Sequence, residues 1–357
     1  MAWRHFPVTF LSLCLAGCAV GPDYQPAQPQ TPARWNDPGD ASVKSRATPQ
    51  AVNPRWWTTF NSPQLNSLIE RAIAGNLSLQ QTVLRIAGAR EQINQAGGAF
   101  LPAVNGSLQA TRQQLGLEGE LKSHDVYGQL ENADPAVSGA LGALTQPVNL
   151  YQGSFDAQWE LDLWGKVRRQ VEATTAQQQQ AIEQRNDALV SLEAEVARAW
   201  LQLRGAQSII ASLNTQIQSA QETLTLTQNR QQGGLSPQLD VENARAQAAN
   251  LEAQLPQYQA QERQAMNALA VLLGKTPGAL DSELRGTQPL PALPDVVPTG
   301  IPSTLARRRP DVREAEATLH AATAQIGVSV AQLFPSLTLT ATSAFTSIPT
   351  SEAATAP

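Results

Sequence analysis

The hydrophobic and polar positions of this chain follow two different periods, which meet near residue 164. From Gln152 to Leu163 apolar and polar residues alternate at every position. A period of two predicts a half-buried strand, and the length suits the roughly 9–11 residues that a tilted strand needs to cross a bilayer. One face carries Gly153, Phe155, Ala157, Trp159, Leu161 and Leu163, and the other carries Gln152, Ser154, Asp156, Gln158, Glu160 and Asp162.

After the turn Trp164-Gly165-Lys166 the apolar positions step by three and four residues, which is typical of a coiled-coil helix. A helix from Lys166 to Gln232 would be about 100 Å long, more than an ordinary globular domain holds. Taken singly, the strand could be a sandwich edge and the helix a cytoplasmic coiled coil. Together, in this order, they favour a membrane-barrel strand continuing into a tunnel of helices. The seam comprises Leu189, Leu192, Val196, Ala199, Leu203, Ala206, Ile210, Leu213, Ile217, Ala220 and Leu224.

Three further features complete the expected elements. Ser62 before Pro63, and Ser236 before Pro237, predict two helix starts with serine as N-cap. The long helix ends at Gly233-Gly234, so the next helix should return antiparallel to it, with a bend at Pro256. A strand beginning at Pro102 should pair with the strand 152–163 as a hairpin with a long connection.

The helix-then-strand unit occurs twice. Ile86, Ile93 and Pro102 align with Leu319, Ile326 and Pro335, and both copies continue as an alternating strand. The second copy predicts a helix starting near Ser303 and a strand over 335–345. We expect this last strand to lack its hairpin partner within the chain.

The N-terminus resembles a bacterial lipoprotein signal. Phe6 to Ala16 is apolar and follows Arg4, and Leu15-Ala16-Gly17 precedes Cys18 as in a lipobox. The alternative is an ordinary secretory signal with a chance cysteine. The resemblance implies acylation of Cys18, which would anchor the protein in lipid; Ala19 at the next position implies the outer membrane. A Pro-rich tether should follow, closed by the aromatic residues Trp56, Trp57 and Phe60.

The chemistry of the chain indicates no catalytic set, cofactor or metal site. His124 and His320 have no motif around them, and a net charge of −5 gives no indication of nucleic acid. The run Arg307-Arg308-Arg309 is more simply explained as a basic stretch on a helix surface than as a nucleic-acid-binding patch. Function should therefore lie in a pore and in docking surfaces. The lumen-facing candidates Asp156, Glu160 and Asp162 would favour cations or merely hydrate the wall.

Several motifs together resemble the outer membrane factor family, the TolC-like efflux channels, in its NodT-type lipoprotein branch. The resemblance implies an α+β membrane protein: a homotrimer whose outer-membrane β-barrel strands continue into a periplasmic α-helical barrel. It also implies export of drugs or other small molecules with a periplasmic adaptor and an inner-membrane RND-type pump. The adaptor-docking tip would be Gly233, Gly234, Leu235 and Ser236. The motifs are Arg308-Arg309-Pro310-Asp311-Val312-Arg313, Leu333-Phe334-Pro335-Ser336-Leu337, Gly21-Pro22-Asp23-Tyr24 and Trp159-Glu160-Leu161-Asp162-Leu163-Trp164-Gly165-Lys166.

The family pattern continues with another strand and a second helical hairpin, whereas this sequence ends at Pro357. We therefore expect that these residues alone do not form a sealed channel, and the alternative function is a non-conducting structural lipoprotein. The expected segments are signal peptide 1–17, lipid-anchored tether 18–62, first repeat helices 63–101, transmembrane hairpin 102–163, helical hairpin 164–273, Pro-rich link 274–302, second repeat helix 303–334 and third strand with C-terminus 335–357.

Overall fold

The computed structural model describes residues 19–28, 31–32, 35, 45–113, 119, 123–124 and 147–347. The predicted signal peptide, Cys18, most of the connection 114–146 and the last ten residues lie outside this part. The chain divides into two compact units, and α3 (Leu77–Gly98), α7 (Lys166–Gln232) and α11 (Pro310–Ala331) contribute residues to both. The first unit comprises Met1–Pro22, Ile93–Glu172 and Ala324–Pro357; the second comprises Asp23–Gln92 and Ala173–Thr323.

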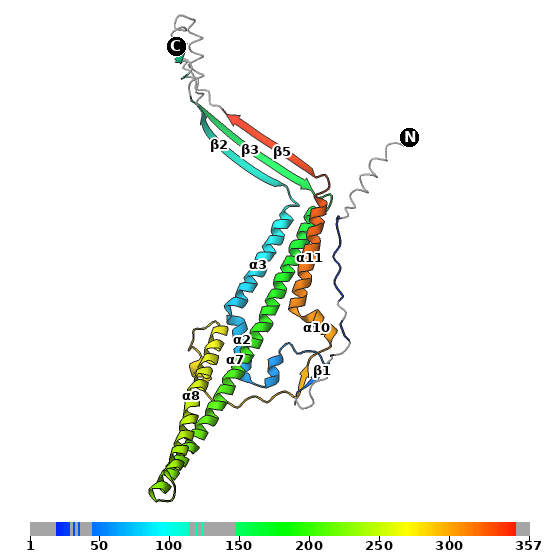
Figure 1. Ribbon diagram of the computed structural model, residues 1–357. Coiled ribbons are helices and arrows are strands. Elements are labelled where there is room, and N and C mark those ends of the chain that lie inside the picture. Colours follow the sequence, from blue (N-terminus) through cyan, green and yellow to red (C-terminus); the bar gives the residue numbers. More distant parts are fainter. Residues whose placement is uncertain are drawn as a thin grey trace, which may run out of the picture. The chain divides into compact units, whose positions relative to one another are not determined.

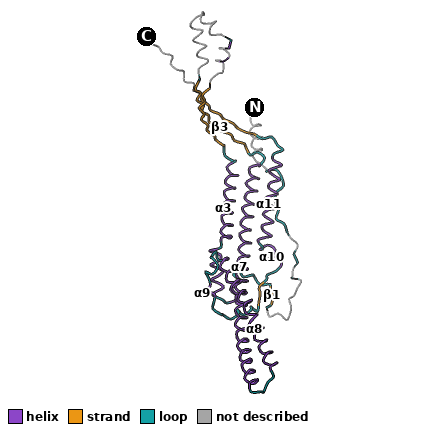
Figure 2. Tube along the Cα trace, turned by 60° about the vertical axis from the view of Figure 1, so that its left-hand side comes forward, coloured by secondary structure: helices purple, strands orange, loops and turns teal. Residues whose placement is uncertain are grey.

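The first unit contains an antiparallel sheet of three strands in the order β2-β3-β5 (Figure 1), which is orange in Figure 2. The strands are β2 (Ala103–Gln113), β3 (Val148–Leu161) and β5 (Leu337–Ser347). The predicted hairpin is confirmed, although β3 ends two residues before Leu163. β5 pairs with the edge of β3 that β2 leaves open, a long-range pairing that was not expected from the sequence. This pairing is not a hairpin, so it does not test the expectation that the last strand lacks its hairpin partner.

The second unit contains the antiparallel helices of the hairpin. The predicted helix from Lys166 to Gln232 is confirmed as α7, and its seam is buried or half-buried throughout. α8 (Gln238–Leu272) returns along it and continues through Pro256. The predicted N-cap Ser236 is wrong: the helix starts later, after Pro237, and the Ser236 hydroxyl instead donates to Asp240 at 3.2 Å.

The core of this unit is formed where α2 (Pro63–Gly75) packs against α7 and α8. Leu65, Leu203 and Leu269 are completely buried there. The Ser62 N-cap is confirmed, since its hydroxyl accepts from the Leu65 amide. The short helix η1 (Trp56–Phe60) places the predicted aromatic plug in the same core, with Trp57 buried.

Two features of this unit differ from the sequence expectation. The tether and the Pro-rich link pair as parallel strands β1 (Arg46–Thr48) and β4 (Val296–Pro298), and α9 (Asp281–Leu284) interrupts the link. The single helix predicted from Ser303 is two helices, α10 (Pro302–Arg308) and α11. The break follows from Pro310, which disfavours helical backbone at Arg309, whose φ and ψ are −60° and 123°.

Among the described helices, none is both long enough and apolar enough to pass through a membrane.

Candidate functional site

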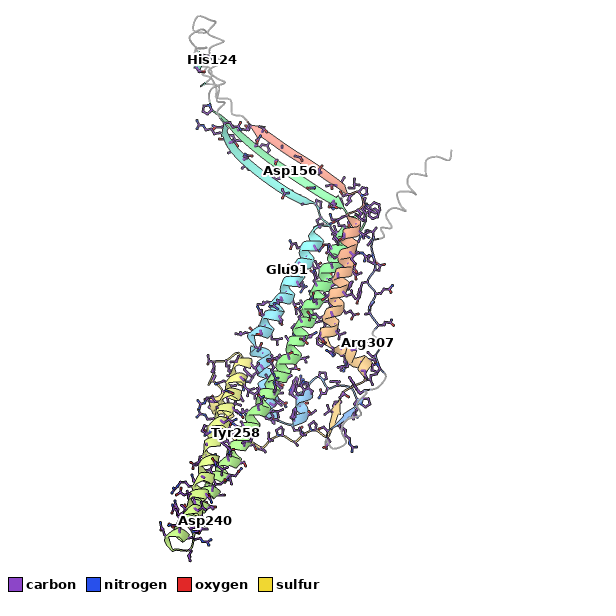
Figure 3. All side chains as sticks on the ribbon, viewed as in Figure 1. Glu91, His124, Asp156, Asp240, Tyr258 and Arg307 are labelled. Atoms are coloured by element: carbon purple, nitrogen blue, oxygen red, sulfur yellow. The ribbon has the colours of Figure 1, made fainter. Side chains whose placement is uncertain are left out.

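The three-stranded sheet of the first unit has two chemically opposite faces. Residues directly opposite in antiparallel strands project to the same side. Asp156, labelled on the sheet in Figure 3, lies opposite Asn105 on β2 and Thr342 on β5. Most positions on each face therefore share one character, although Ala103 and Ala344 lie on the polar side and Ser343 and Ser347 on the apolar side. The polar face includes Asn105, Ser107, Gln109, Gln152, Ser154, Asp156, Gln158, Glu160, Thr338, Thr340, Thr342 and Thr346, and the apolar face includes Val104, Leu108, Phe155, Ala157, Trp159, Leu161, Leu337, Leu339, Ala341 and Phe345.

The apolar face is uncovered within the described chain. Leu108 is 82% exposed, Phe155 62% and Phe345 59%. Soluble monomers rarely show contiguous apolar patches that span a whole sheet face. Glycine makes room for one of the rings, because an added Cβ on Gly153 would collide with Phe345. Side chains on this face therefore pack against one another across the strands. Most of their apolar surface stays exposed, however, and is suited to an apolar environment.

The polar face carries linked hydroxyl and carboxylate groups. Ser107 and Ser154 are hydrogen-bonded through their hydroxyl oxygens at 2.8 Å, and Ser154 Oγ lies 3.1 Å from Asp156 Oδ2. Hydroxyls and side-chain amides make up most of the remainder of this face, as the residues above show. Such a surface is suited to contact with water.

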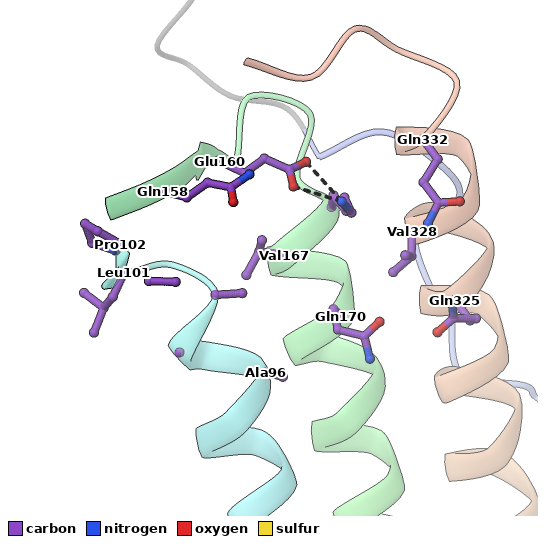
Figure 4. Close-up of a pocket in the computed structure, with 14 residues that line it drawn as sticks. Ala96, Leu101, Pro102, Gln158, Glu160, Val167, Gln170, Gln325, Val328 and Gln332 are labelled. Atoms are coloured by element: carbon purple, nitrogen blue, oxygen red, sulfur yellow. Dashed lines mark hydrogen bonds and ion pairs between the residues drawn. The ribbon is translucent and has the colours of Figure 1, made fainter. Parts of the chain in front are cut away.

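The three predicted lumen carboxylates have three different surroundings. Asp156 lies in the middle of the polar face. Glu160 lies near its end and forms an ion pair with Lys166 Nζ at 3.0 Å (Figure 4). Asp162 lies beyond β3, where its carboxylate accepts the backbone N–H groups of Val167 at 2.9 Å and Arg168 at 3.1 Å. Asp162 therefore caps the first turn of α7, which the strict alternation in the sequence concealed.

A cavity of about 650 Å³ lies beside the junction of strand and helix in the first unit (Figure 4). Apolar groups and side-chain amides line it, together with Glu160 and Lys166. Amides at these positions can donate to and accept from a polar solute, but they supply no nucleophile. Besides Glu160, the lining residues labelled in Figure 4 are Ala96, Leu101, Pro102, Gln158, Val167, Gln170, Gln325, Val328 and Gln332.

The predicted tip residues form one compact turn between α7 and α8. Gly234 has φ +72°, the Leu235 amide donates to Arg230 O at 2.8 Å, and the Gly234 amide donates to Gln231 O at 2.9 Å. These two bonds define a Schellman closure, which needs the left-handed conformation that glycine provides. The Leu235 side chain is 73% exposed. The turn therefore presents an apolar side chain on a rigid base.

A buried polar network in the second unit has no signal in the sequence. Arg204 is completely buried; its guanidinium donates to Gln64 on α2, to Gln207 and, at 2.6 Å, to Gly286 O. Burial lowers the pKa of Arg204. A buried charge that loses its partners is strongly destabilising, so the guanidinium of Arg204 must keep these hydrogen bonds in the folded protein. The bond to Gly286 O therefore holds this link residue against α7.

Comparison with known proteins gives consistent matches. Residues 68–275 and 301–356 match the family described as "Outer membrane efflux protein". The chain is 32% identical over 339 residues to nodulation protein T of Rhizobium leguminosarum bv. trifolii, covering 95% of this chain and 67% of that protein. It is 33% identical over 344 residues to the toluene efflux pump outer membrane protein TtgF of Pseudomonas putida, covering 94% of this chain and 66% of that protein.

A solved structure of the outer-membrane channel OprN superposes with a TM-score of 0.74 at 31% identity, covering 93% of this chain and 73% of that one. The chain spans about two thirds of the length of the curated relatives it matches.

Proposed function

Because the chain belongs to the outer membrane efflux protein family, we propose that it is the outer-membrane channel component of a tripartite efflux system. It carries small molecules from the periplasm, or from an inner-membrane pump, to the exterior. The observation that supports this proposal most directly is the two-faced sheet. Its apolar side suits lipid, and its polar side suits a water-filled lumen.

The edges of the sheet favour assembly of several copies. Within the described residues, β2 and β5 each pair along one edge only. Unpaired backbone groups are costly in lipid, so the outer edges of β2 and β5 would pair with strands outside this sheet. A homotrimer with a shared barrel satisfies this requirement and agrees with the family resemblance.

Transport selectivity in this proposal depends on the polar face. Asp156 supplies a carboxylate among hydroxyls and amides, which attracts cations more than anions. Relatives are named for toluene efflux and for pyoverdine export, so the family accommodates solutes of different polarity. We propose small organic molecules as the substrate class.

The α7–α8 turn is the proposed docking site for a periplasmic adaptor, which connects the channel to an inner-membrane pump of the RND type. Leu235→Asp places a charge where the apolar side chain would dock, and its exposure means that the fold should survive. Leu84→Asp is the matched control, because Leu84 is 71% exposed on α3, away from the turn.

The test measures accumulation of a fluorescent cationic dye in cells that carry the adaptor and the pump. Leu235→Asp should raise dye accumulation toward that of cells lacking the protein, and Leu84→Asp should leave it at the wild-type level. Equal export by wild type and Leu235→Asp would reject the docking site. Equal export with and without the protein would reject the channel function.

The proposed localisation in the outer membrane includes acylation of Cys18, which would hold the N-terminus in that membrane while the helices extend into the periplasm. Several acyl chains bind a bilayer firmly, whereas one is marginal. Cys18→Ala should abolish incorporation of labelled palmitate. Equal labelling of the two proteins would reject the anchor.

A further inference from the structure

The residues directly after Cys18 form an extended segment that binds to a defined set of residues on the body of the protein. These body residues are here called the seat. We propose that residues 19–24, here called the N-terminal strap, dock onto α7 and α11 and thereby fix where the anchored end of the chain lies. The proposal deepens the proposed function, because it assumes that Cys18 carries the membrane anchor. The seat consists of a set of contacts in the first unit and a separate set in the second.

In the first unit, both backbone hydrogen-bonding groups of Val20 are satisfied by the body of the protein. The Val20 amide donates to the carbonyl of Trp164 at 3.1 Å, and Arg169 Nε donates to the carbonyl of Val20 at 3.3 Å. The groups that bind it are themselves fixed. Arg169 is 5% exposed and pairs with Glu172 at 2.8 Å, and the Trp164 ring stacks on Phe334 with centroids 4.7 Å apart.

Two glycines, Gly21 and Gly165, allow the strap to approach this closely. A third, Gly327, leaves room for the Arg169 side chain that donates to Val20, because an added Cβ on Gly327 would lie 2.9 Å from Arg169 Cγ and Cδ. An added Cβ on Gly21 would lie 2.6 Å from Gly327 Cα on α11, and one on Gly165 would lie 2.7 Å from Ala19 Cα. Gly21 and Gly165 also have φ values of +93° and +78°, which other residues rarely adopt. Gly88 on α3 differs, because an added Cβ there meets nothing within 4 Å. The seat therefore excludes side chains at the points where strap and body meet.

In the second unit, the side chain of Tyr24 makes the contacts. Its ring stacks on His320 with centroids 4.2 Å apart and an interplanar angle of 16°. Its hydroxyl donates to Glu316 Oε1 at 3.0 Å. Burial and the neighbouring Glu316 raise the pKa of Tyr24, so the hydroxyl remains a proton donor.

The position of the seat decides where an anchor on Cys18 would be held. Ala19 contacts Gly165, the glycine of the turn between β3 and α7. Ala19 directly follows Cys18 in the sequence, and consecutive Cα atoms are about 3.8 Å apart, so an anchor attached at Cys18 would be joined to the chain one residue before this contact. A seated strap sets the anchor beside the point where the strands become helices, whereas a free tether would leave its position open.

Hydrogen exchange of the strap, measured by mass spectrometry on the purified full chain, tests the inference. The wild-type peptide containing Val20 should exchange at least about tenfold more slowly than an unstructured peptide. Gly327→Leu and Tyr24→Ala should each remove most of that protection. The control Gly88→Leu should keep it, and peptides of β3 and of α7 beyond Glu172 should exchange alike in all four proteins, because Gly327→Leu displaces only the Arg169 side chain in the first turns of α7.

Unprotected exchange of the wild-type strap, or protection that survives Gly327→Leu, would overturn the inference. The strap should also stay protected in Cys18→Ala; protection lost there would mean that the lipid holds the strap, which is the reverse of the proposal. Exchange does not depend on export. A seated strap without dye efflux would therefore reject the channel function alone, and normal efflux with an unseated strap would reject this inference alone.

Discussion

Asp162 should stabilise the strand-to-helix junction rather than charge the lumen, and Asp162→Ala separates the two roles. The wild-type carboxylate accepts two backbone N–H groups of α7 and lies 3.2 Å from Arg168 Nε. Its side chain is 10% exposed, whereas that of Arg168 is 39% exposed. The substitution removes the cap from the first turn of the longest helix.

The magnitude follows from the separate contacts. Loss of a capping side chain costs about 0.5–2 kcal/mol. The ion pair with Arg168 adds at most about a few tenths of a kcal/mol, because solvent screens the charge of the exposed Arg168 side chain. We therefore expect a loss of roughly 1–2 kcal/mol, which corresponds to about a 5–30-fold change in the opening equilibrium of the first turn.

Hydrogen exchange of peptides covering residues 166–170 is the assay. Asp162→Ala should accelerate exchange of the Val167 and Arg168 amides by that factor. Asp156→Ala is the matched control, since it removes an equal charge whose carboxylate contacts Ser154 within β3. Unchanged exchange in Asp162→Ala, combined with altered cation transport, would show that the lumen role is the correct one.

Two further predictions concern the core of the second unit. Leu269 is completely buried, so Leu269→Ala should lower the free energy of unfolding by about 2–5 kcal/mol in denaturant titrations; Leu239→Ala, 67% exposed on the same helix, should have little effect, and equal effects would contradict the packing described. Burial raises the pKa of Glu193 above its ordinary value of 4.5, and Arg185 opposes the shift. The folded state then holds this proton more tightly, so the stability of the wild type relative to Glu193→Gln should fall as the pH rises above about 4.5; a difference independent of pH would contradict it.

The sequence predicted long elements better than their ends. The alternation at 152–163 and the seam of α7 each repeat over many residues, so chance substitutions do not hide them, and both elements were found. The ends depend on single contacts. Ser236 has the pattern of an N-cap, yet its hydroxyl donates to Asp240, and Arg309 leaves the helix because Pro310 follows it.

Long-range pairings could not be predicted from local pattern. β1 lies in the Pro-rich tether and β4 in the Pro-rich link, and each strand has only three residues. The two strands pair with each other although they are far apart in the sequence. The Arg204 network likewise joins α2, α7 and Gly286. For the candidate site, alternation predicted the two faces of β3, whereas the alignment of three strands into one polar and one apolar surface required the register.

Cysteine accessibility on β3 tests the central claim that the sheet separates lipid from an aqueous lumen. Ala157 and Gln158 are adjacent and lie on opposite faces, and the sequence contains only Cys14 and Cys18 as native cysteines. Ala157→Cys and Gln158→Cys would be treated with a water-soluble maleimide in isolated outer membranes, with the unsubstituted protein as background. We expect rapid labelling at position 158 and protection at position 157 until the membrane is dissolved and the protein denatured. Equal labelling at both positions, or faster labelling at 157, would contradict it.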